Sequence, residues 1–209
     1  TSAFKSFFIN NTVIDTDCFS RGQLQSKQWL VTELGNLDVQ LGTVFLCAGW
    51  YATLATMLFE SDIKVDKVRS FDIDPTCVDI AETFNKPWFM EQWRFKSITQ
   101  DIMDIDYNEH MWQFWSNANN RMSYPITDSP DTIINTSCEH IENFAEWYAK
   151  IPDGKLVILQ SNNFFDVQEH INCVKDITEF SNMAPMSNTL YAGDLDLPKY
   201  KRFMLIGYK

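Results

Sequence analysis

Residues 131–160 read DTIINTSCEHIENFAEWYAKIPDGKLVILQ, and this stretch decides the fold class. A β-branched apolar run at 131–136 ends in small and polar residues, and Glu139 and His140 follow it. An amphipathic segment, a Pro-Asp-Gly turn and a second apolar run at 156–159 complete a strand–helix–strand unit. Ligands of open parallel sheets bind outside the carboxyl ends of the strands. We therefore expect Glu139 and His140 to lie where chemistry takes place.

The rest of the chain continues this alternation of strands and helices. Apolar patterns predict strands at 43–48, 65–71 and 95–99, helices at 23–34, 52–60, from Pro75 and at 173–183, and a hairpin of 189–197 with 200–208. We interpret 85–94 as an aromatic-rich insertion and 104–130 as a short helix followed by a loop over the site. These elements predict an α/β fold, doubly wound, with a mostly parallel seven-stranded sheet, helices on both faces and a C-terminal antiparallel hairpin.

Composition predicts a folded protein and limits its partners. The chain has 209 residues, of which 45% are hydrophobic, and a net charge of −11. We expect one domain over 1–209, with an N-terminal helical extension at 1–42 and a Rossmann-like core at 43–209. The acidic charge argues against duplex nucleic acid as a partner. Lys199, Lys201 and Arg202 cluster near the C-terminus, and we interpret them as a solvated strand edge.

Cysteine and histidine spacing argues against a metal site. The five cysteines form no CxxC pair, and the three histidines, at 110, 140 and 170, lie 30 residues apart. Cysteines in apolar segments favour reduced, buried thiols in a cytoplasmic protein. We find no signal peptide and no apolar run of the length that crosses a bilayer, so we expect no membrane association.

Three strand ends have features of a nucleotide-like binding site. The first strand and its turn read TVFLCAGWYATLA (43–55), in which small residues at 47–49 permit close backbone approach to a ligand. The second strand ends FDID (71–74), and Asp72 lies 23 residues after Gly49, the spacing of a ribose-binding carboxylate. Asp74, before Pro75, suits a helix cap. After the third strand, the Asp101 carboxylate is suited to accept a hydrogen bond from the amino group of an adenine. The apolar side chain of Ile102 is suited to pack against the face of the adenine ring.

With these segments the chain resembles class I S-adenosylmethionine-dependent methyltransferases. The matching segments are CAGWYATLA, FDIDPTCVDIA, QDI and SCEHIENFAEWYAKIPDGKLVIL. The resemblance implies S-adenosylmethionine as cofactor, held by Ala48, Gly49, Trp50, Asp72, Ile73, Asp101, Ile102 and Ser137. In that family the turn has glycines at alternate positions, whereas this chain has Ala48, Trp50 and Ala52 there. A non-catalytic S-adenosylmethionine-binding protein with a degenerate turn is therefore one alternative.

Glu139 and His140 are the candidate catalytic residues. Methyl transfer is an in-line displacement, and a general base helps when the nucleophile carries a proton. His140 suits that role for an oxygen or nitrogen nucleophile, and Glu139 alternatively suits the first turn of a helix. Cys138 fits a buried thiol better than a nucleophile.

Candidate substrate contacts follow the fifth strand. Asn162, Asn163 and His170 lie in the loop after it, and we expect them to bind a small or modestly sized acceptor. A nicotinamide-dependent oxidoreductase is a second alternative; the absence of GxGxxG argues against it.

Overall fold

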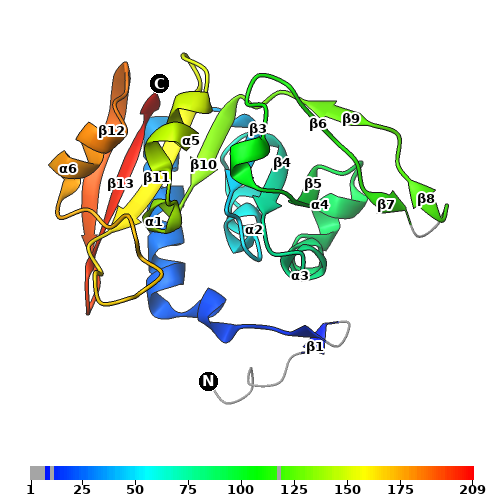
Figure 1. Ribbon diagram of the computed structural model, residues 1–209, viewed down its shortest axis with the longest axis horizontal. Coiled ribbons are helices and arrows are strands. Elements are labelled where there is room, and N and C mark those ends of the chain that lie inside the picture. The colour runs from blue at the N-terminus through cyan, green and yellow to red at the C-terminus, as the bar shows by residue number, and fades with distance from the viewer. Residues whose placement is uncertain (1–7, 10–11, 117–118) are drawn as a thin grey trace.

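A single mixed sheet organises the chain. The computed structural model describes residues 8–9, 12–116 and 119–209. Seven strands form the order β12-β13-β11-β10-β3-β4-β5 (Figure 1). Their bounds are β3 Gly42–Cys47, β4 Val65–Asp72, β5 Phe95–Thr99, β10 Thr132–Asn135, β11 Leu156–Asn162, β12 Asn188–Asp196 and β13 Lys201–Tyr208. Strand β13 runs antiparallel to β11 and β12, and the pairs among β11, β10, β3, β4 and β5 are parallel. The predicted fold class is confirmed.

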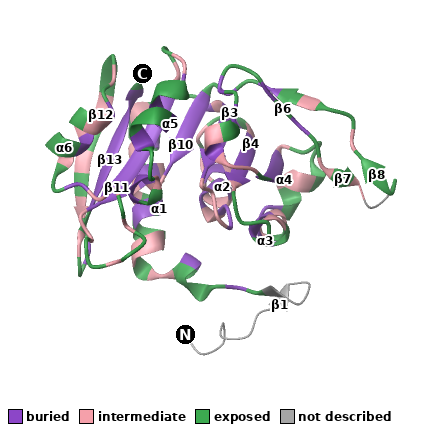
Figure 2. Ribbon diagram, viewed as in Figure 1, coloured by how far each residue is buried: buried purple, intermediate pink, exposed green. Residues whose placement is uncertain are grey.

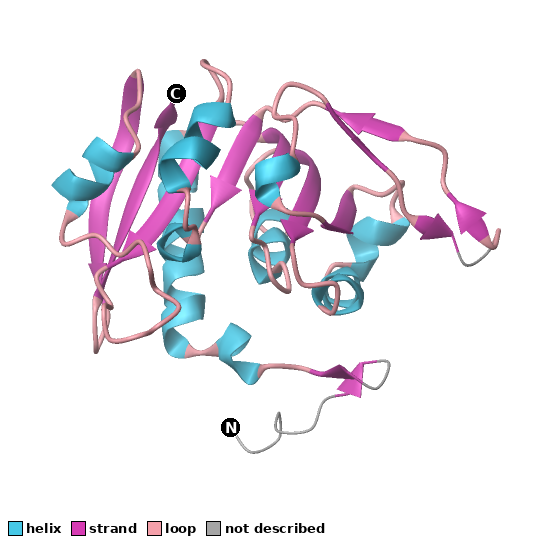
Figure 3. Cartoon of the chain, in the orientation of Figure 1, coloured by secondary structure: helices cyan, strands magenta, loops and turns pink. Residues whose placement is uncertain are grey.

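Helices cover both faces of the sheet (Figure 3). They are α1 Arg21–Leu37, α2 Thr53–Phe59, α3 Cys77–Phe84, α4 Lys86–Met90, α5 Phe144–Lys150 and α6 Ile177–Met183, with 3₁₀ turns η1 Thr16–Phe19, η2 Ile102–Asp104 and η3 Cys138–His140. Side chains alternate across a strand, so Val44 and Leu46 pack with α1 and α2 while Phe45 and Cys47 pack with α5 and α6. Figure 2 shows the central strands as the buried layer between them. No helix of the described residues has the length and apolar character needed to span a membrane.

The prediction for 104–130 is wrong in both parts. No α-helix forms there in the described residues; β6 His110–Trp112 pairs with β9 Ile126–Asp128, and β7 Trp115–Ser116 with β8 Arg121–Met122. Asp128 anchors the segment, because its carboxylate accepts hydrogen bonds from Lys67 and Arg69 (both 2.6 Å) and from Trp112 (2.9 Å). Lys67 and Arg69 both belong to β4, so Asp128 ties the end of the segment to that strand.

The N-terminal segment lies beside the carboxyl ends of the parallel strands (Figure 1). It comprises β1 Phe8–Ile9, β2 Thr12–Val13 and η1, and residues 1–7, 10 and 11 of the predicted extension lie outside the described residues. Ile14 and Cys18 pack in one buried cluster with Tyr51, Cys77 and Ile80. The segment thereby holds the turn after β3 against α3.

Candidate functional site

The turn after β3 has a backbone that favours glycine, but its side chains are larger. Ala48, Trp50 and Ala52 have φ values of 50°, 49° and 51°, in the left-handed region. An L-residue there costs roughly 1–2 kcal/mol relative to the right-handed conformation. These are the three alternate positions at which the resemblance places glycine. The turn therefore has the backbone conformation of a glycine-rich turn, although residues other than glycine occupy these three positions.

Gly49 is a glycine for a different reason, the packing of the turn on β4. Its N–H donates to the carbonyl of Phe71 at 3.0 Å. A Cβ at this position would lie 2.1 Å from Ser70 Oγ, which is far inside van der Waals contact. The missing side chain lets the turn lie directly on the end of the neighbouring strand.

Asp72, at the end of β4, joins the turn to the second strand. Its Oδ2 accepts from the N–H of Trp50 at 2.7 Å, and its Oδ1 accepts from the N–H of Asp74 at 3.0 Å. A carboxylate offers about four acceptor sites, so roughly two remain for a ligand. Asp74 does not cap α3 as predicted, because Thr76 is the N-cap residue; its Oδ1 instead accepts from the N–H of Thr76 at 2.9 Å and closes a turn immediately before the helix.

The remaining predicted cofactor positions surround this junction at the strand ends. Ile73 is 70% exposed and offers an apolar surface, whereas Ile102 is 7% exposed and belongs to the core. Asp101 accepts from the N–H of Met103 at 2.8 Å and begins η2. Trp50 stacks on Tyr51 with ring centroids 4.8 Å apart. The fold thus brings the ends of β3, β4, β5 and β10 to one edge, with Ser137 beyond β10.

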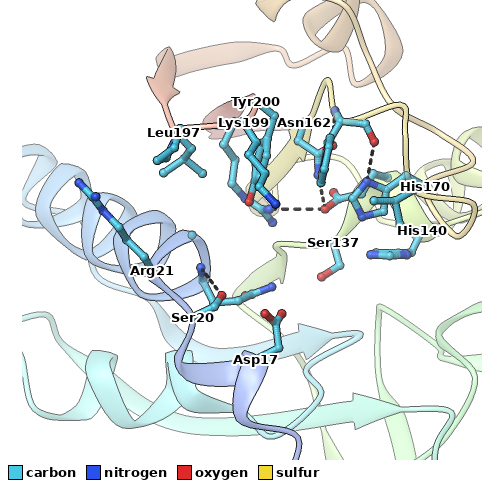
Figure 4. Close-up of a pocket in the computed structure, with 17 residues that line it drawn as sticks. Asp17, Ser20, Arg21, Ser137, His140, Asn162, His170, Leu197, Lys199 and Tyr200 are labelled. Atoms are coloured by element: carbon cyan, nitrogen blue, oxygen red, sulfur yellow. Dashed lines mark hydrogen bonds and ion pairs between the residues drawn. The ribbon is translucent and has the colours of Figure 1, made fainter. Parts of the chain in front are cut away.

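A cavity of about 460 Å³ lies next to Ser137 (Figure 4). Three segments that are distant in sequence form its walls: the start of α1, the segment after β10 and the loops beside β11 and β13. Its lining includes Asp17, Ser20, Arg21, Ser137, Glu139, His140, Asn162, His170, Lys199, Tyr200 and Arg202. The volume falls within the range of small-molecule sites.

Glu139 is buried at the back of this cavity, with only 2% of its surface exposed. Its Oε1 accepts from Asn162 Nδ2 at 2.7 Å and forms an ion pair with Arg202 Nη1 at 3.5 Å. Its Oε2 has no hydrogen-bond partner among the described residues, although it is also buried. Cys138 beside it is fully buried, and burial holds the pKa of its thiol well above the ordinary value. The thiol form suits packing, not nucleophilic attack.

Two histidines meet at the mouth of the cavity. The rings of His140 and His170 lie edge to face, with centroids 4.7 Å apart. Nδ1 of His140 lies 3.0 Å from the carbonyl oxygen of Glu169, and Nδ1 of His170 lies 2.9 Å from that of Phe164. A carbonyl oxygen only accepts, so each Nδ1 carries a proton and donates it. In the neutral ring, each Nε2 then keeps a lone pair.

The predicted substrate residues divide by position. His170 and Asn162 line the cavity, and the Asn162 side chain is occupied by Glu139 on one side and by the N–H of Phe164, at 2.9 Å, on the other. Asn163 is not among the lining residues. Its Oδ1 accepts from the N–H of Lys201 at 2.7 Å and ties the loop to β13.

Sequence reasoning missed Arg202 as a member of the site. The predicted solvated edge holds for Lys201, which is exposed and pairs with Asp194 and Asp196. It is wrong for Arg202, which is 4% exposed and donates to Gln160, to the carbonyl of Thr136 and to Glu139. Alternation on β13 is the signal that separates the two residues, because neighbours on a strand point to opposite faces.

Comparisons with known proteins identify the fold. The sequence matches no protein-family model and no curated protein. Among solved structures, the N-methyltransferase NodS from Bradyrhizobium japonicum WM9 matches with a TM-score of 0.59 and 9% identity, over 88% of this chain and 96% of that one. A putative sarcosine dimethylglycine methyltransferase from Galdieria sulphuraria matches with a TM-score of 0.62 and 10% identity, over 90% and 86%.

A third solved structure extends the comparison. The magnesium protoporphyrin IX methyltransferase ChlM from Synechocystis PCC 6803, with bound S-adenosylmethionine, matches with a TM-score of 0.56 and 14% identity, over 89% of this chain and 80% of that one. The chain therefore has the fold of class I S-adenosylmethionine-dependent methyltransferases.

Proposed function

We propose that this chain is an S-adenosylmethionine-dependent methyltransferase acting on an oxygen or nitrogen atom of a small or modestly sized acceptor. The observation that carries the proposal is the hydrogen bond between Trp50 and Asp72, which joins the strained turn to the ribose-binding position. NodS has also been solved in complex with S-adenosyl-L-homocysteine, so ligands of this class occur in structures of this fold.

The residues present fit the cofactor. Asp72 has two acceptor sites left for the ribose hydroxyls, and the exposed Ile73 offers a surface for the adenine. Asp101 has one carboxylate oxygen beyond the one that accepts from Met103, and that oxygen suits the adenine amino group. Ser137 lies between these positions and the cavity, where the methionine part would extend. When bound, S-adenosylmethionine supplies an electrophilic methyl group.

The cavity beside Ser137 would hold the acceptor. In the proposed transfer the acceptor atom would take the methyl group, the electron pair of the broken carbon–sulfur bond would stay on sulfur, and Nε2 of His140 would accept the proton that the acceptor loses. His140 and His170 present lone pairs to this cavity, and buried Glu139 is fixed behind them by Asn162 and Arg202. Because its carboxylate is enclosed and ion-paired, we assign Glu139 the role of orienting the neighbouring side chains or of binding a ligand.

The alternatives make different demands on the site. A nicotinamide-dependent oxidoreductase would use the same turn and carboxylate, and the absence of GxGxxG argues against it. A binding protein without turnover would account for the strained turn, but it leaves the histidine pair unused. We place the protein in the cytoplasm as a single domain without a duplex nucleic acid partner, since all five cysteines are free and the net charge is −11.

Calorimetric titration with S-adenosylhomocysteine tests the proposal. We expect binding to wild type and weaker binding to Asp72→Ala by about 5–150-fold, because loss of hydrogen bonds to the ribose costs about 1–3 kcal/mol. Asp74→Ala is the matched control, since Asp74 is a neighbouring carboxylate that also accepts a backbone N–H, but within the turn before α3. Equal affinities of all three proteins would remove the ribose role of Asp72, and no binding to wild type would overturn the proposal.

A further inference from the structure

The fold brings two consecutive residues with metal-ligating side chains, Glu139 and His140, together with a third, His170, which is distant from them in the sequence. Glu139 and His140 belong to η3, and His170 lies in the loop after β11. A carboxylate oxygen of Glu139 and a ring nitrogen of each histidine all lie within 4.8 Å of one another. All three residues line the same cavity (Figure 4). We propose that Glu139, His140 and His170 bind a divalent transition-metal ion, for which Zn²⁺ is the best match.

The two oxygens of the Glu139 carboxylate are not equally satisfied. Its Oε1 has two partners, whereas its buried Oε2 has none among the described residues. An unsatisfied buried polar atom costs about 1–3 kcal/mol, and more when the group is charged. Arg202 does not satisfy it, because its contact with Glu139 is on Oε1. A cation bound at Oε2 would remove this deficit.

Hydrogen bonds to backbone carbonyls orient the two imidazoles. Metal-bound histidines usually donate their other ring N–H to a backbone carbonyl or a carboxylate. Both histidines here do so, His140 to Glu169 and His170 to Phe164, at 3.0 and 2.9 Å. The lone pair is thereby placed on Nε2 in both rings before any ligand arrives. Asn162, through its hydrogen bond to Oε1, plays the same orienting part for the carboxylate.

The donor set selects the kind of ion. Two imidazole nitrogens and one carboxylate oxygen suit Zn²⁺ and other first-row ions such as Fe²⁺ or Co²⁺, whereas Mg²⁺ and Ca²⁺ prefer oxygen ligands alone. Three protein ligands leave at least one coordination position open, and the cavity adjoins it. Arg202 lowers the negative charge of Glu139, so we expect an exchangeable ion and not a structural one.

The open position gives the acceptor a defined chemistry. This step rests on the proposed function, whereas metal binding itself does not. An acceptor hydroxyl bound to the ion would be held in the cavity that Ser137 lines. A metal-bound hydroxyl releases its proton to water more readily and keeps a lone pair for attack on the methyl group, so the histidines can be ligands and need not act as a general base. The substrate class is a small molecule with a metal-binding hydroxyl.

Cobalt titration of the chelator-treated protein tests the site. Co²⁺ reports its ligands through visible absorption, and calorimetry with Zn²⁺ gives the stoichiometry. We expect one ion per chain in wild type. His140→Ala, His170→Ala and Glu139→Gln should each weaken binding by more than the roughly 10–100-fold typical of outer-shell changes. Far-ultraviolet circular dichroism of each variant establishes that it is folded.

Two control variants sharpen the result. Asp17→Asn removes a carboxylate that lines the same cavity, and Cys173→Ser removes the thiol that contacts Asn162 Oδ1 at 3.3 Å. Both should bind the ion as wild type does. Absence of one-to-one binding in wild type, unchanged affinity in both histidine variants, or an equal loss in Asp17→Asn would each overturn the site. S-adenosylhomocysteine binding, measured on the same preparations, separates failure of the metal site from failure of the proposed function.

Discussion

The backbone N–H of Trp50 donates a 2.7 Å hydrogen bond to Oδ2 of Asp72. This contact makes the turn after β3 and the carboxylate at the end of β4 one unit, because Asp72 also accepts from the N–H of Asp74. A change in the turn therefore acts on Asp72, the residue that we propose binds the ribose.

Gly49→Ala should lower the free energy of unfolding by about 1–3 kcal/mol, as overpacking of a filled site does. The new Cβ would lie 2.1 Å from Ser70 Oγ. Ser70→Ala removes that oxygen, which has no hydrogen-bond partner among the described residues. In urea unfolding, the double variant should be more stable than the two single changes predict, by at least about 0.5 kcal/mol. Additive effects would show that the clash is relieved elsewhere.

Ala48→Gly should raise stability, despite the greater flexibility of glycine in the unfolded chain. Relief of the left-handed strain is worth roughly 1–2 kcal/mol and the added unfolded-state entropy costs about 0.5–1 kcal/mol, which leaves a gain of up to about 1.5 kcal/mol. Gly35→Ala is the opposite exchange in the exposed part of α1, where a Cβ meets no atom within 4 Å, and it too should stabilise. Thermal unfolding measures both. A destabilised Ala48→Gly would contradict the strain assigned to the turn.

S-adenosylhomocysteine should change the tryptophan fluorescence of wild type, and Trp50→Phe should lack most of that change. Trp50 is half-buried, stacks on Tyr51 and follows Gly49 in the proposed cofactor turn. Trp147→Phe is the control, since Trp147 belongs to α5 and is buried in the core. If Trp50→Phe responds as wild type does, the indole does not border the ligand.

Lys27→Met should be more stable than wild type at neutral pH, and the difference should shrink as pH rises. Burial, with a contribution from Arg202, lowers the pKa of Lys27 from 10.5 to about 8. Between these values the unfolded chain holds the proton and the folded chain does not, so the wild-type lysine destabilises below pH 8 and has no effect above 10.5. The advantage of the variant should fall by about 1–3 kcal/mol between pH 7 and 10. A pH-independent difference, by urea unfolding, would show that Lys27 titrates as an exposed lysine does.

The local pattern of apolar residues predicted the strands well, because a buried strand is a short continuous run of apolar residues in the sequence. The run Phe95–Thr99 forms β5 with the predicted bounds, and Asp72 ends β4 as its spacing from Gly49 indicated. The prediction of a helix and a loop for 104–130 was wrong for two reasons. Trp112 and Phe114 are two residues apart, which is the spacing of one face of a strand and not of a helix. The ion pairs of Asp128 are made with β4, which is distant in the sequence.

The site was less accessible to sequence reasoning than the strands were. Regular spacing of the histidines argued against a metal site, yet β10 and β11 are neighbours, so the segments that follow them bring His140 and His170 together. Arg202 joined the site for the same reason, through the pairing of β13 with β11. Contacts between strand ends follow from sheet order, and local spacing does not reveal them.

Equilibrium binding of labelled S-adenosylmethionine to the purified chain tests the central claim most directly. The account predicts one site per chain, displacement of the label by S-adenosylhomocysteine but not by NADH, and weaker retention by Asp72→Ala than by Asp74→Ala. A wild-type protein that is folded and does not bind the label, or that releases it to NADH, would contradict the claim.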